Sequence, residues 1–190
     1  MKIFWKNKKV FVTGSTGFLG SWLTKHLVDL GAEVTLLFYE SKNESELIRS
    51  GYIKKVKIVE GALQDYSLLE QAIYENQIDT VFHLGAQTQV TEAVSNPLET
   101  YESNVRGTYF LLEACRSNKQ LIKRIIVASS DKAYGSSINL PYIEETPLKA
   151  IYPYDVSKAC TDLIALSYYH TYGLPVVITR CSNIYGGGDL

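Results

Sequence analysis

Tyr154 and Lys158, two residues that can transfer protons, lie four positions apart in the segment YDVSK. At this spacing both side chains share one face of a helix. A phenol is a poor base at neutral pH because its pKa is about 10, but a nearby ammonium favours its ionised form. Tyr154 could then remove a hydroxyl proton while a hydride leaves the same carbon. The pair alone is a weak signal because the chain contains 14 tyrosines.

A glycine pattern, Gly14-Ser-Thr-Gly17-Phe-Leu-Gly20, lies between an apolar run at 9–13 and a segment with leucines at helical spacing. Between a strand and a helix, this pattern predicts a dinucleotide-binding loop. Gly14 permits a tight turn, Gly17 lets backbone N–H groups approach a pyrophosphate, and Gly20 lets helix and strand pack closely. The N-terminus of the helix then faces the phosphates with its partial positive charge.

Glu40 follows the second expected strand, twenty residues after Gly20. An acid at this place hydrogen-bonds the ribose hydroxyls and repels a 2′-phosphate, which favours NAD over NADP. Ser41 and Lys42 follow at once and could contact a phosphate instead, so NADP stays an alternative. A cationic nicotinamide would act with Lys158 to favour the phenolate.

Alternating strands and helices must position these residues. We expect strands at 9–13, 33–38, 56–59, 80–84, 124–128 and 176–179, and helices at 18–30, 68–74, 97–118 and 152–172. This alternation is typical of the α/β class, and it predicts a doubly wound, mainly parallel sheet with helices on both faces. The long stretch 129–151 follows a strand and is therefore expected to carry function.

The helix expected at 152–172 has an apolar side opposite Tyr154 and Lys158. We expect that side to face the core and the Tyr–Lys pair to point toward the carboxyl edge of the sheet; its residues are Val156, Ala159, Cys160, Leu163 and Ile164. His83 ends the fourth expected strand, but no second metal ligand stands at a useful spacing from it. We therefore interpret His83 as structural and expect no metal site.

Composition narrows the function classes. The chain has 190 residues, 46% of them hydrophobic and 21% charged, with a formal net charge of -1. That balance argues against a strongly basic nucleic-acid binder, and no apolar run has the length of a membrane span. The first residues lack the pattern of a secretory signal, and the three cysteines are widely spaced. We therefore expect free thiols and a cytoplasmic protein without membrane or nucleic-acid partners.

Four motifs in order, TGSTGFLG, SSDKAYG, YDVSK and RCSNIYGGG, resemble the extended short-chain dehydrogenase/reductases, the NAD-dependent epimerase/dehydratase family that acts on nucleotide sugars. The resemblance covers essentially the whole chain. It implies a Rossmann domain, a bound nicotinamide cofactor, a nucleotide-diphosphate sugar as substrate, and a Ser–Tyr–Lys triad at Ser130, Tyr154 and Lys158. In that triad Ser130 hydrogen-bonds the substrate hydroxyl and positions it for Tyr154.

Within this family, Asp131-Lys132 is similar to the CDP-glucose branch of the 4,6-dehydratases. Those enzymes oxidise C4 of the sugar, eliminate water across C5 and C6, and return the hydride to C6. Elimination needs an acid and a base, and the resemblance implies Asp131 as the acid and Lys132 as the base or proton relay. A 4-epimerase or reductase of the same family stays an alternative, and so does a dinucleotide-binding domain without catalysis.

The remaining assignments also rest on the resemblance. Cofactor contacts are expected from Gly14, Thr16, Gly17, Phe18, Leu19, Gly20, Glu40, Leu63, Leu84, Ala86, Tyr154 and Lys158, and substrate contacts from Gln87, Asn104, Ser130 and Asn183. Family members carry a further, smaller substrate domain, so we interpret residues 1–190 as one NAD(P)-binding domain from the N-terminal part of a longer protein. A homodimer through the helices at 97–118 and 152–172 is expected by analogy.

Overall fold

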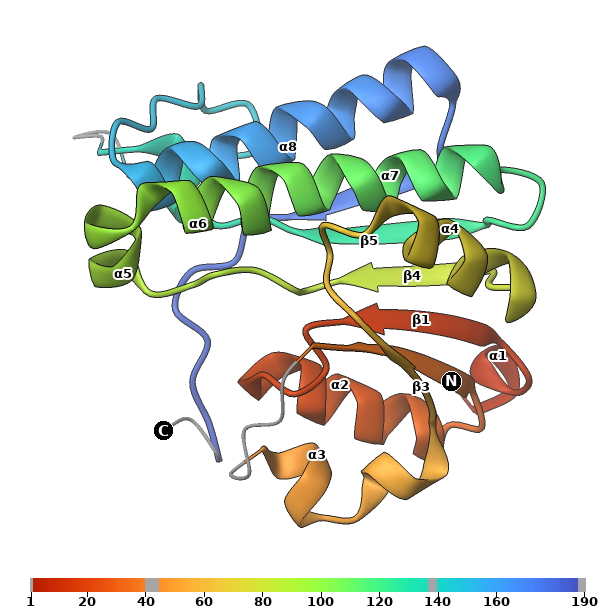
Figure 1. Ribbon diagram of the computed structural model, residues 1–190. Helices are drawn as coiled ribbons and strands as arrows, with labels where there is room; N and C mark the ends of the chain where they lie inside the picture. The colour runs from red at the N-terminus through yellow and green to blue at the C-terminus, as the bar shows by residue number, and fades with distance from the viewer. Residues whose placement is uncertain (1, 40–44, 137–139, 188–190) are drawn as a thin grey trace.

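Six parallel strands form the centre of the structure. They are Lys9–Thr13 (β1), Glu33–Phe38 (β2), Lys57–Glu60 (β3), Thr80–His83 (β4), Arg124–Ala128 (β5) and Val176–Thr179 (β6). The computed structural model describes residues 2–39, 45–136 and 140–187, and there the strands pair in the order β3-β2-β1-β4-β5-β6 (Figure 1). The order reverses between β1 and β4, so the predicted Rossmann-type sheet is confirmed.

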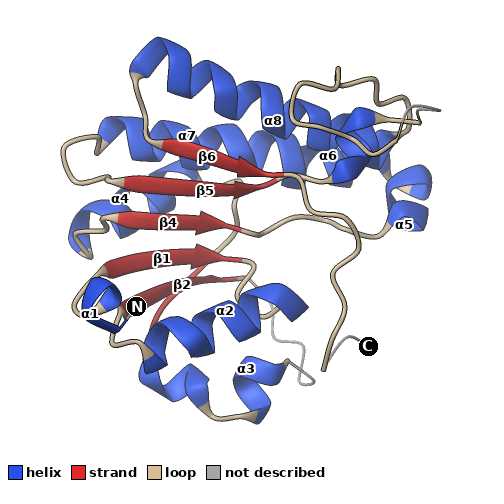
Figure 2. Cartoon of the chain, turned by 180° about the vertical axis from the view of Figure 1, so that it is seen from behind, coloured by secondary structure: helices blue, strands red, loops and turns tan. Residues whose placement is uncertain are grey.

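Helices cover both faces of the sheet. The α-helices are Lys2–Trp5 (α1), Phe18–Asp29 (α2), Glu46–Arg49 (α3), Tyr66–Glu75 (α4), Val90–Ser95 (α5), Pro97–Tyr101 (α6), Gly107–Ser117 (α7) and Pro153–Tyr172 (α8). Shorter turns are Tyr52–Lys55 (η1), Glu102–Arg106 (η2) and Asp131–Tyr134 (η3). One core cluster joins the sheet to α4, α7 and α8, and a second joins it to α2 and α3 on the opposite face, as Figure 2 shows from behind.

The central strands read as continuous apolar runs because both of their faces are buried. Val10, Phe11 and Val12 of β1 are fully buried and alternate between the two core clusters. In register, Val12 lies between Leu36 of β2 and Phe82 of β4. This pairing brings the carboxyl ends of β1 and β4 side by side, at the edge where ligands bind in such sheets.

The long helix expected at 97–118 contains an irregular turn. Pro97 opens α6 as predicted, with the Asn96 side chain capping it by accepting from the N–H of Glu99. The following turn, η2, is π-helical, and the N–H of Gly107 closes it on the carbonyl of Glu102. This wider turn contains Asn104, which is 1% exposed. The sequence pattern gave no sign of the π-helical turn, which places a buried amide beside α8.

α8 turns its polar side, not its apolar side, toward the rest of the molecule. Its buried residues are Ser157, Lys158, Thr161, Asp162 and Ala165, whereas Leu163 is 57% exposed. The expectation that Val156, Ala159, Cys160, Leu163 and Ile164 form the core-facing side is therefore wrong, although Ile164 packs partly against the core. Helical periodicity locates a stripe of apolar side chains but does not show what covers it.

Candidate active site

The glycine loop packs tightly against the end of β4. Gly14 has a φ of +70°, and a Cβ there would lie 2.6 Å from the backbone nitrogen of Gly85. A Cβ on Gly20 would collide with the carbonyl oxygen of Gly14. Gly17 is the N-cap of α2, and neither a side-chain cap nor an acidic residue occupies the first turn of that helix. The N–H groups of that turn therefore form a ready site for an anion.

Those of the other expected cofactor-binding residues that the structure describes lie around this loop. Phe18 and Leu19 open α2, and Leu19 is 38% exposed. Leu63 packs against the backbone of Gly85 and Gly107, so close that a Cβ on Gly107 would lie 2.8 Å from that of Leu63. Thr16 lies in the loop itself, and Leu84 and Ala86 directly follow β4. Glu40, with Ser41 and Lys42, lies outside the described residues.

Lys158 joins α8 to the carboxyl end of β5. Its Nζ donates a hydrogen bond to the carbonyl oxygen of Ala128 at 3.0 Å, and the Ser129 hydroxyl donates to the Lys158 carbonyl at 3.2 Å. The residue is 5% exposed. Burial lowers the pKa of Lys158 to about 8, because an ammonium loses its hydration there. The side chain is fixed in place and still protonated at pH 7.

Tyr154 lies one turn before Lys158, partly buried, beside Ser130. Burial raises the pKa of the phenol, hydrogen bonding with Ser130 lowers it, and the carboxylates of Asp155 and Asp131 raise it further. The net pKa lies above its ordinary value, whereas the sequence argument expected the Lys158 ammonium to favour the phenolate. The residues of this chain therefore keep Tyr154 protonated at neutral pH.

Ser130, Asp131 and Lys132 form the start of η3. The Ser130 hydroxyl accepts the N–H of Lys132 at 3.2 Å and donates to the Asp131 carboxylate at 3.2 Å. The sequence reading missed Asp155, although it stands next to Tyr154 in YDVSK. Burial raises the pKa of Asp155, Lys132 lowers it and Asp131 raises it, so these three charged groups face one another. The Tyr154 phenol thus lies near two carboxylates, and one of them, Asp155, also interacts with the Lys132 ammonium.

Asn104 and Gln87 meet on the β4 side of the site. The Asn104 amide accepts the Gln87 N–H at 2.7 Å and donates to the Gln87 carbonyl at 2.9 Å. Among the described residues, the side-chain Oε1 of Gln87 is buried without a hydrogen-bond partner. Asn183, in contrast, is exposed in the segment after β6. That segment crosses the edge of the sheet to α2, where Trp22 donates to the Gly187 carbonyl at 2.8 Å (Figure 1).

An ion pair between Asp162 and Arg180 supports η3 through a contact with Tyr134. Arg180, just after β6, donates to both carboxylate oxygens of Asp162 at 2.7 and 2.9 Å, and Asp162 is fully buried. The same guanidinium donates to the Tyr134 hydroxyl at 2.9 Å and to the Glu144 carbonyl at 2.8 Å. Tyr134 in turn stacks on Tyr142 with ring centroids 4.8 Å apart. Through these contacts α8, β6 and the loop after η3 hold the Asp131–Lys132 segment in place.

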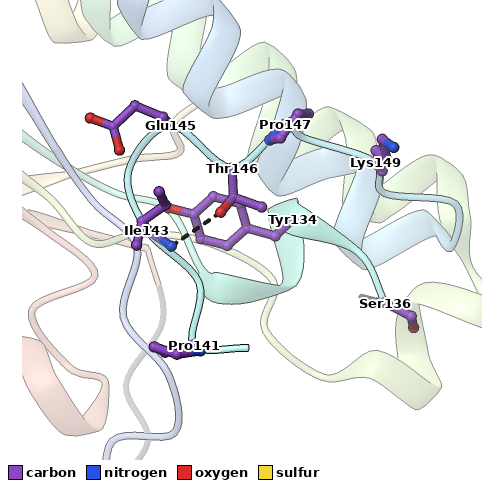
Figure 3. Close-up of a pocket in the computed structure, with 8 residues that line it drawn as sticks. All are labelled: Tyr134, Ser136, Pro141, Ile143, Glu145, Thr146, Pro147 and Lys149. Atoms are coloured by element: carbon purple, nitrogen blue, oxygen red, sulfur yellow. Dashed lines mark hydrogen bonds between the residues drawn. The ribbon is translucent and has the colours of Figure 1, made fainter. Parts of the chain in front are cut away.

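Two hollows of the surface lie next to this centre. One is a cavity of about 440 Å³ lined by Tyr134, Ser136, Pro141, Ile143, Glu145, Thr146, Pro147 and Lys149. Figure 3 shows these side chains, with Lys149 and Glu145 in the wall of the cavity. None of the triad residues lines it. A larger hollow of about 1070 Å³ follows β6 and reaches the site only at Asp131.

His83 and the cysteines have no metal-binding arrangement. Both ring nitrogens of His83 are hydrogen-bonded inside the protein, and burial, with a smaller effect of Lys158, lowers its pKa to about 3. Across residues 2–39, 45–136 and 140–187, no group of three potential ligands could hold a metal ion. Cys115, Cys160 and Cys181 are free thiols. Nor does any helix in these ranges have the length and apolar character to cross a membrane.

Comparison with known proteins gives consistent matches. The family model described as GDP-mannose 4,6 dehydratase matches residues 11–189. The chain is 34% identical over 201 residues to the CDP-glucose 4,6-dehydratase of Salmonella typhimurium, covering 99% of this chain and 55% of that protein. It is 32% identical over 199 residues to dTDP-glucose 4,6-dehydratase 1 of Escherichia coli, covering 94% and 55%. The chain thus spans about half the length of these curated relatives.

Solved structures agree. The dTDP-glucose 4,6-dehydratase DesIV from Streptomyces venezuelae, with NAD and TYD bound, superposes with a TM-score of 0.83 at 32% identity, covering 94% of this chain and 56% of that one. A UDP-N-acetylglucosamine 4-epimerase from Methanobrevibacter ruminantium, in complex with UDP-N-acetylmuramic acid, gives a TM-score of 0.86 at 32% identity, covering 95% and 56%. Dehydratases and epimerases therefore share this fold.

Proposed function

The chain belongs to the family that the GDP-mannose 4,6 dehydratase model describes, within the extended short-chain dehydrogenase/reductases, and we propose that it carries the reaction centre of an NAD-dependent nucleotide-sugar 4,6-dehydratase. One observation supports this most strongly. Tyr154 and Lys158 lie on one helix, α8, beside Ser130 and Asp131. This group stands at the carboxyl edge of the sheet, where the glycine loop also lies. A binding domain without catalysis has no need for this grouping.

The glycine loop fits a dinucleotide. The close packing at Gly14 and Gly20 leaves no room for a Cβ, and the uncapped first turn of α2 suits a pyrophosphate. Leu63, Leu84 and Ala86 lie on the same edge and would border the cofactor. The cofactor would supply a reversible hydride acceptor. We propose NAD because solved relatives are described with NAD bound, while the Glu40 argument against NADP remains a prediction.

The residues of the site have complementary roles in oxidation at C4. As the phenolate, which the Lys158 ammonium and a bound cationic nicotinamide would both favour, Tyr154 would take the proton of the C4 hydroxyl, and Ser130 beside it would orient that hydroxyl. Lys158 is protonated at pH 7 and fixed one helical turn away, so its charge favours the phenolate form that accepts the proton. The unpartnered Oε1 of Gln87 can accept a hydrogen bond from the substrate. Asn104 would contribute to substrate binding by fixing the backbone of Gln87.

The elimination step would use the two residues that follow Ser130. Asp131 as the neutral carboxylic acid would donate a proton to the departing C6 hydroxyl, which leaves as water, and Lys132 as the neutral amine would take up the proton from C5 directly or as a relay, so that the two residues end as carboxylate and ammonium. The likeness to the CDP-glucose 4,6-dehydratase supports a CDP-hexose as substrate. A 4-epimerase is the second candidate, because a UDP-N-acetylglucosamine 4-epimerase shares this fold at 32% identity.

Mass spectrometry tests the proposal directly. The protein is incubated with NAD and, in turn, with CDP-, dTDP-, UDP- and GDP-hexoses, with Tyr154→Phe as the inactive control. Loss of one water from one nucleotide sugar supports the dehydratase and identifies its substrate. A new epimer of unchanged mass supports the second candidate instead. No conversion of any of the sugars contradicts both.

Assembly and location remain predictions. The exposed apolar side chains of Leu98 on α6 (70% exposed) and Leu163 on α8 (57%) support the expected homodimer through these helices. Sedimentation velocity of the protein and of Leu163→Glu tests it, since a charge at a buried apolar interface weakens association. The cytoplasmic location expected from the sequence is tested by fractionation of the source cells.

A further inference from the structure

A line of buried hydrogen bonds runs through His83. The Nδ1 atom of His83 lies 2.9 Å from the Thr13 hydroxyl at the end of β1, and Nε2 lies 3.0 Å from the Thr108 hydroxyl on α7. The N–H of Gly85 donates to the Thr13 hydroxyl at 3.0 Å. All three side chains are at most 3% exposed. His83 therefore bridges the strand that precedes the glycine loop and the helix that follows the π-helical turn.

The direction of each bond follows from the number of hydrogens. The Thr108 hydroxyl donates its single hydrogen to the carbonyl of Asn104, so toward His83 it can only accept, and the hydrogen of the imidazole must be on Nε2. A neutral imidazole then leaves Nδ1 bare, and it accepts from the Thr13 hydroxyl. Every donor and acceptor in the line has a partner. Neutral histidine suits the position because it offers a donor and an acceptor on opposite sides of a rigid ring.

The line continues from Asn104 to the proposed site. Its carbonyl also accepts the Thr161 hydroxyl at 3.0 Å, and its side-chain amide holds the backbone of Gln87. The same amide donates to the Ser157 hydroxyl at 2.9 Å, which donates to the carbonyl of Tyr154 at 2.7 Å. Both the Gln87 backbone and the first turn of α8 are thus tied to one buried residue.

We infer that His83 is a positioning residue. In its neutral form with the hydrogen on Nε2, it connects the end of β1 through Thr108 to Asn104. Asn104 in turn fixes the positions of Gln87 and Tyr154. The inference rests on the proposed function in taking Tyr154 as the reacting group. His83 touches neither substrate nor cofactor in this role and acts only through Thr108 and Asn104. Loss of the Thr108 link should move the first turn of α8 and leave the core packing intact.

The first experiment uses the unmodified chain. Long-range ¹H–¹⁵N NMR spectra distinguish the two neutral forms of an imidazole and the cation. The chain has 3 histidines, so His83→Gln assigns the signal. We expect His83 to be protonated on Nε2 alone at pH 7. A hydrogen on Nδ1, or a cation, would overturn the inference.

The second experiment measures the coupling to Tyr154. Protein labelled with ¹³C at the tyrosine ring carbon that bears the hydroxyl is titrated with base, and Tyr154→Phe assigns the signal. We expect Thr108→Val to shift the midpoint of the Tyr154 titration by about 0.5 pH unit or more, because burial and Ser130 set that midpoint. Thr108→Ser, which keeps the hydroxyl, should restore it.

Thr80→Val is the matched control. Thr80 is buried on the same strand as His83, and its hydroxyl donates to Asp79 at the opposite end of the sheet. A purely structural role would lower the melting temperature in both valine variants and leave the Tyr154 titration unchanged. An unchanged titration in folded Thr108→Val therefore overturns the inference. A failure to bind NAD would contradict the proposed function, not the line of hydrogen bonds, because neither NMR experiment requires a cofactor.

Discussion

The ammonium of Lys158 donates a hydrogen bond at 3.0 Å to the carbonyl oxygen of Ala128, the last residue of β5. This contact fixes the side chain at the carboxyl edge of the sheet, one turn after Tyr154 on α8. It also places a positive charge on a residue, Lys158, that is only 5% exposed. A buried ammonium destabilises the folded protein relative to a neutral amine, and this gives a measurable pH dependence.

Lys158 should make the protein more stable as the pH rises above neutrality. The pKa of Lys158 is about 8 in the folded protein, whereas an ordinary exposed lysine has a pKa of 10.5. Between these two pH values the unfolded chain therefore binds more protons than the folded protein. The free energy of unfolding should therefore rise by about 3 kcal/mol across that window. Urea unfolding of the wild-type protein and of Lys158→Met at several pH values isolates this effect. Parallel curves for the two proteins would contradict it.

His83 should make the protein sensitive to acid. The pKa of His83 is about 3 in the folded protein, whereas an ordinary exposed histidine has a pKa of 6.5. As the pH falls, His83 is therefore protonated in the unfolded chain before it is protonated in the folded protein. The free energy of unfolding should fall by about 2 kcal/mol between pH 7 and pH 5, and further toward pH 3. Chemical denaturation at both pH values should show a smaller loss for His83→Gln. An equal loss in the two proteins would exclude His83 as the cause.

Tyr154→Phe should separate binding from chemistry. The variant keeps the ring but loses the hydroxyl that takes the C4 proton, so turnover should fall by about 10²- to 10⁴-fold. NAD affinity, measured by isothermal titration calorimetry, should stay within about threefold because the glycine loop is untouched. Turnover at the wild-type rate would remove Tyr154 from the mechanism.

Asp131→Asn and Lys132→Met should block elimination and spare oxidation. Each removes one proton-transfer group, so the release of dehydrated sugar should fall by about 100-fold or more. Reduced nicotinamide should still form in a single turnover, as followed by its absorbance. Lys149→Met, which changes a lysine in the wall of the neighbouring cavity, should behave like the wild-type protein. Full dehydration by the first two variants would contradict the proposed roles of Asp131 and Lys132 in elimination.

Breaking the Asp162–Arg180 pair should be strongly destabilising. Asp162 is fully buried and accepts hydrogen bonds from two of the three guanidinium nitrogens, Nε and Nη2, so Asp162→Asn leaves the Arg180 charge without its partner. We expect a loss of about 3–5 kcal/mol in the free energy of unfolding. The control is Glu102→Gln, which breaks an exposed pair with Arg106 and should cost less than about 1 kcal/mol. Similar losses in both variants would contradict the supporting role of Arg180.

The sequence predicted most of the architecture because the signals are local. Four strands, β1, β2, β5 and β6, have the expected bounds, since short apolar runs ending in glycine or polar residues leave few alternatives. α1, α3 and α5 were missed because helices of four to six residues carry too few positions for a periodic signal.

The candidate site, like the architecture, was predictable only where its sequence signals are local. The glycine spacing and the Tyr–Lys pair are recognised from residue type and helical spacing, so the sequence by itself predicts a reaction centre at Gly14, Tyr154 and Lys158. It also led to the family through motifs that are contiguous in the chain. These features depend on residues within a few positions of each other.

Only the tertiary structure decided how the pair is oriented and held. Lys158 faces inward and the apolar stripe with Leu163 faces outward, because bonds from β5 and η2 satisfy the polar side of α8. The link from Thr13 through His83 to Asn104 joins residues that are distant in the sequence, and Thr13 and His83 alone are 70 positions apart. No local pattern encodes such contacts, since they form only when parallel strands and their crossover helices bring distant segments to one edge of the sheet.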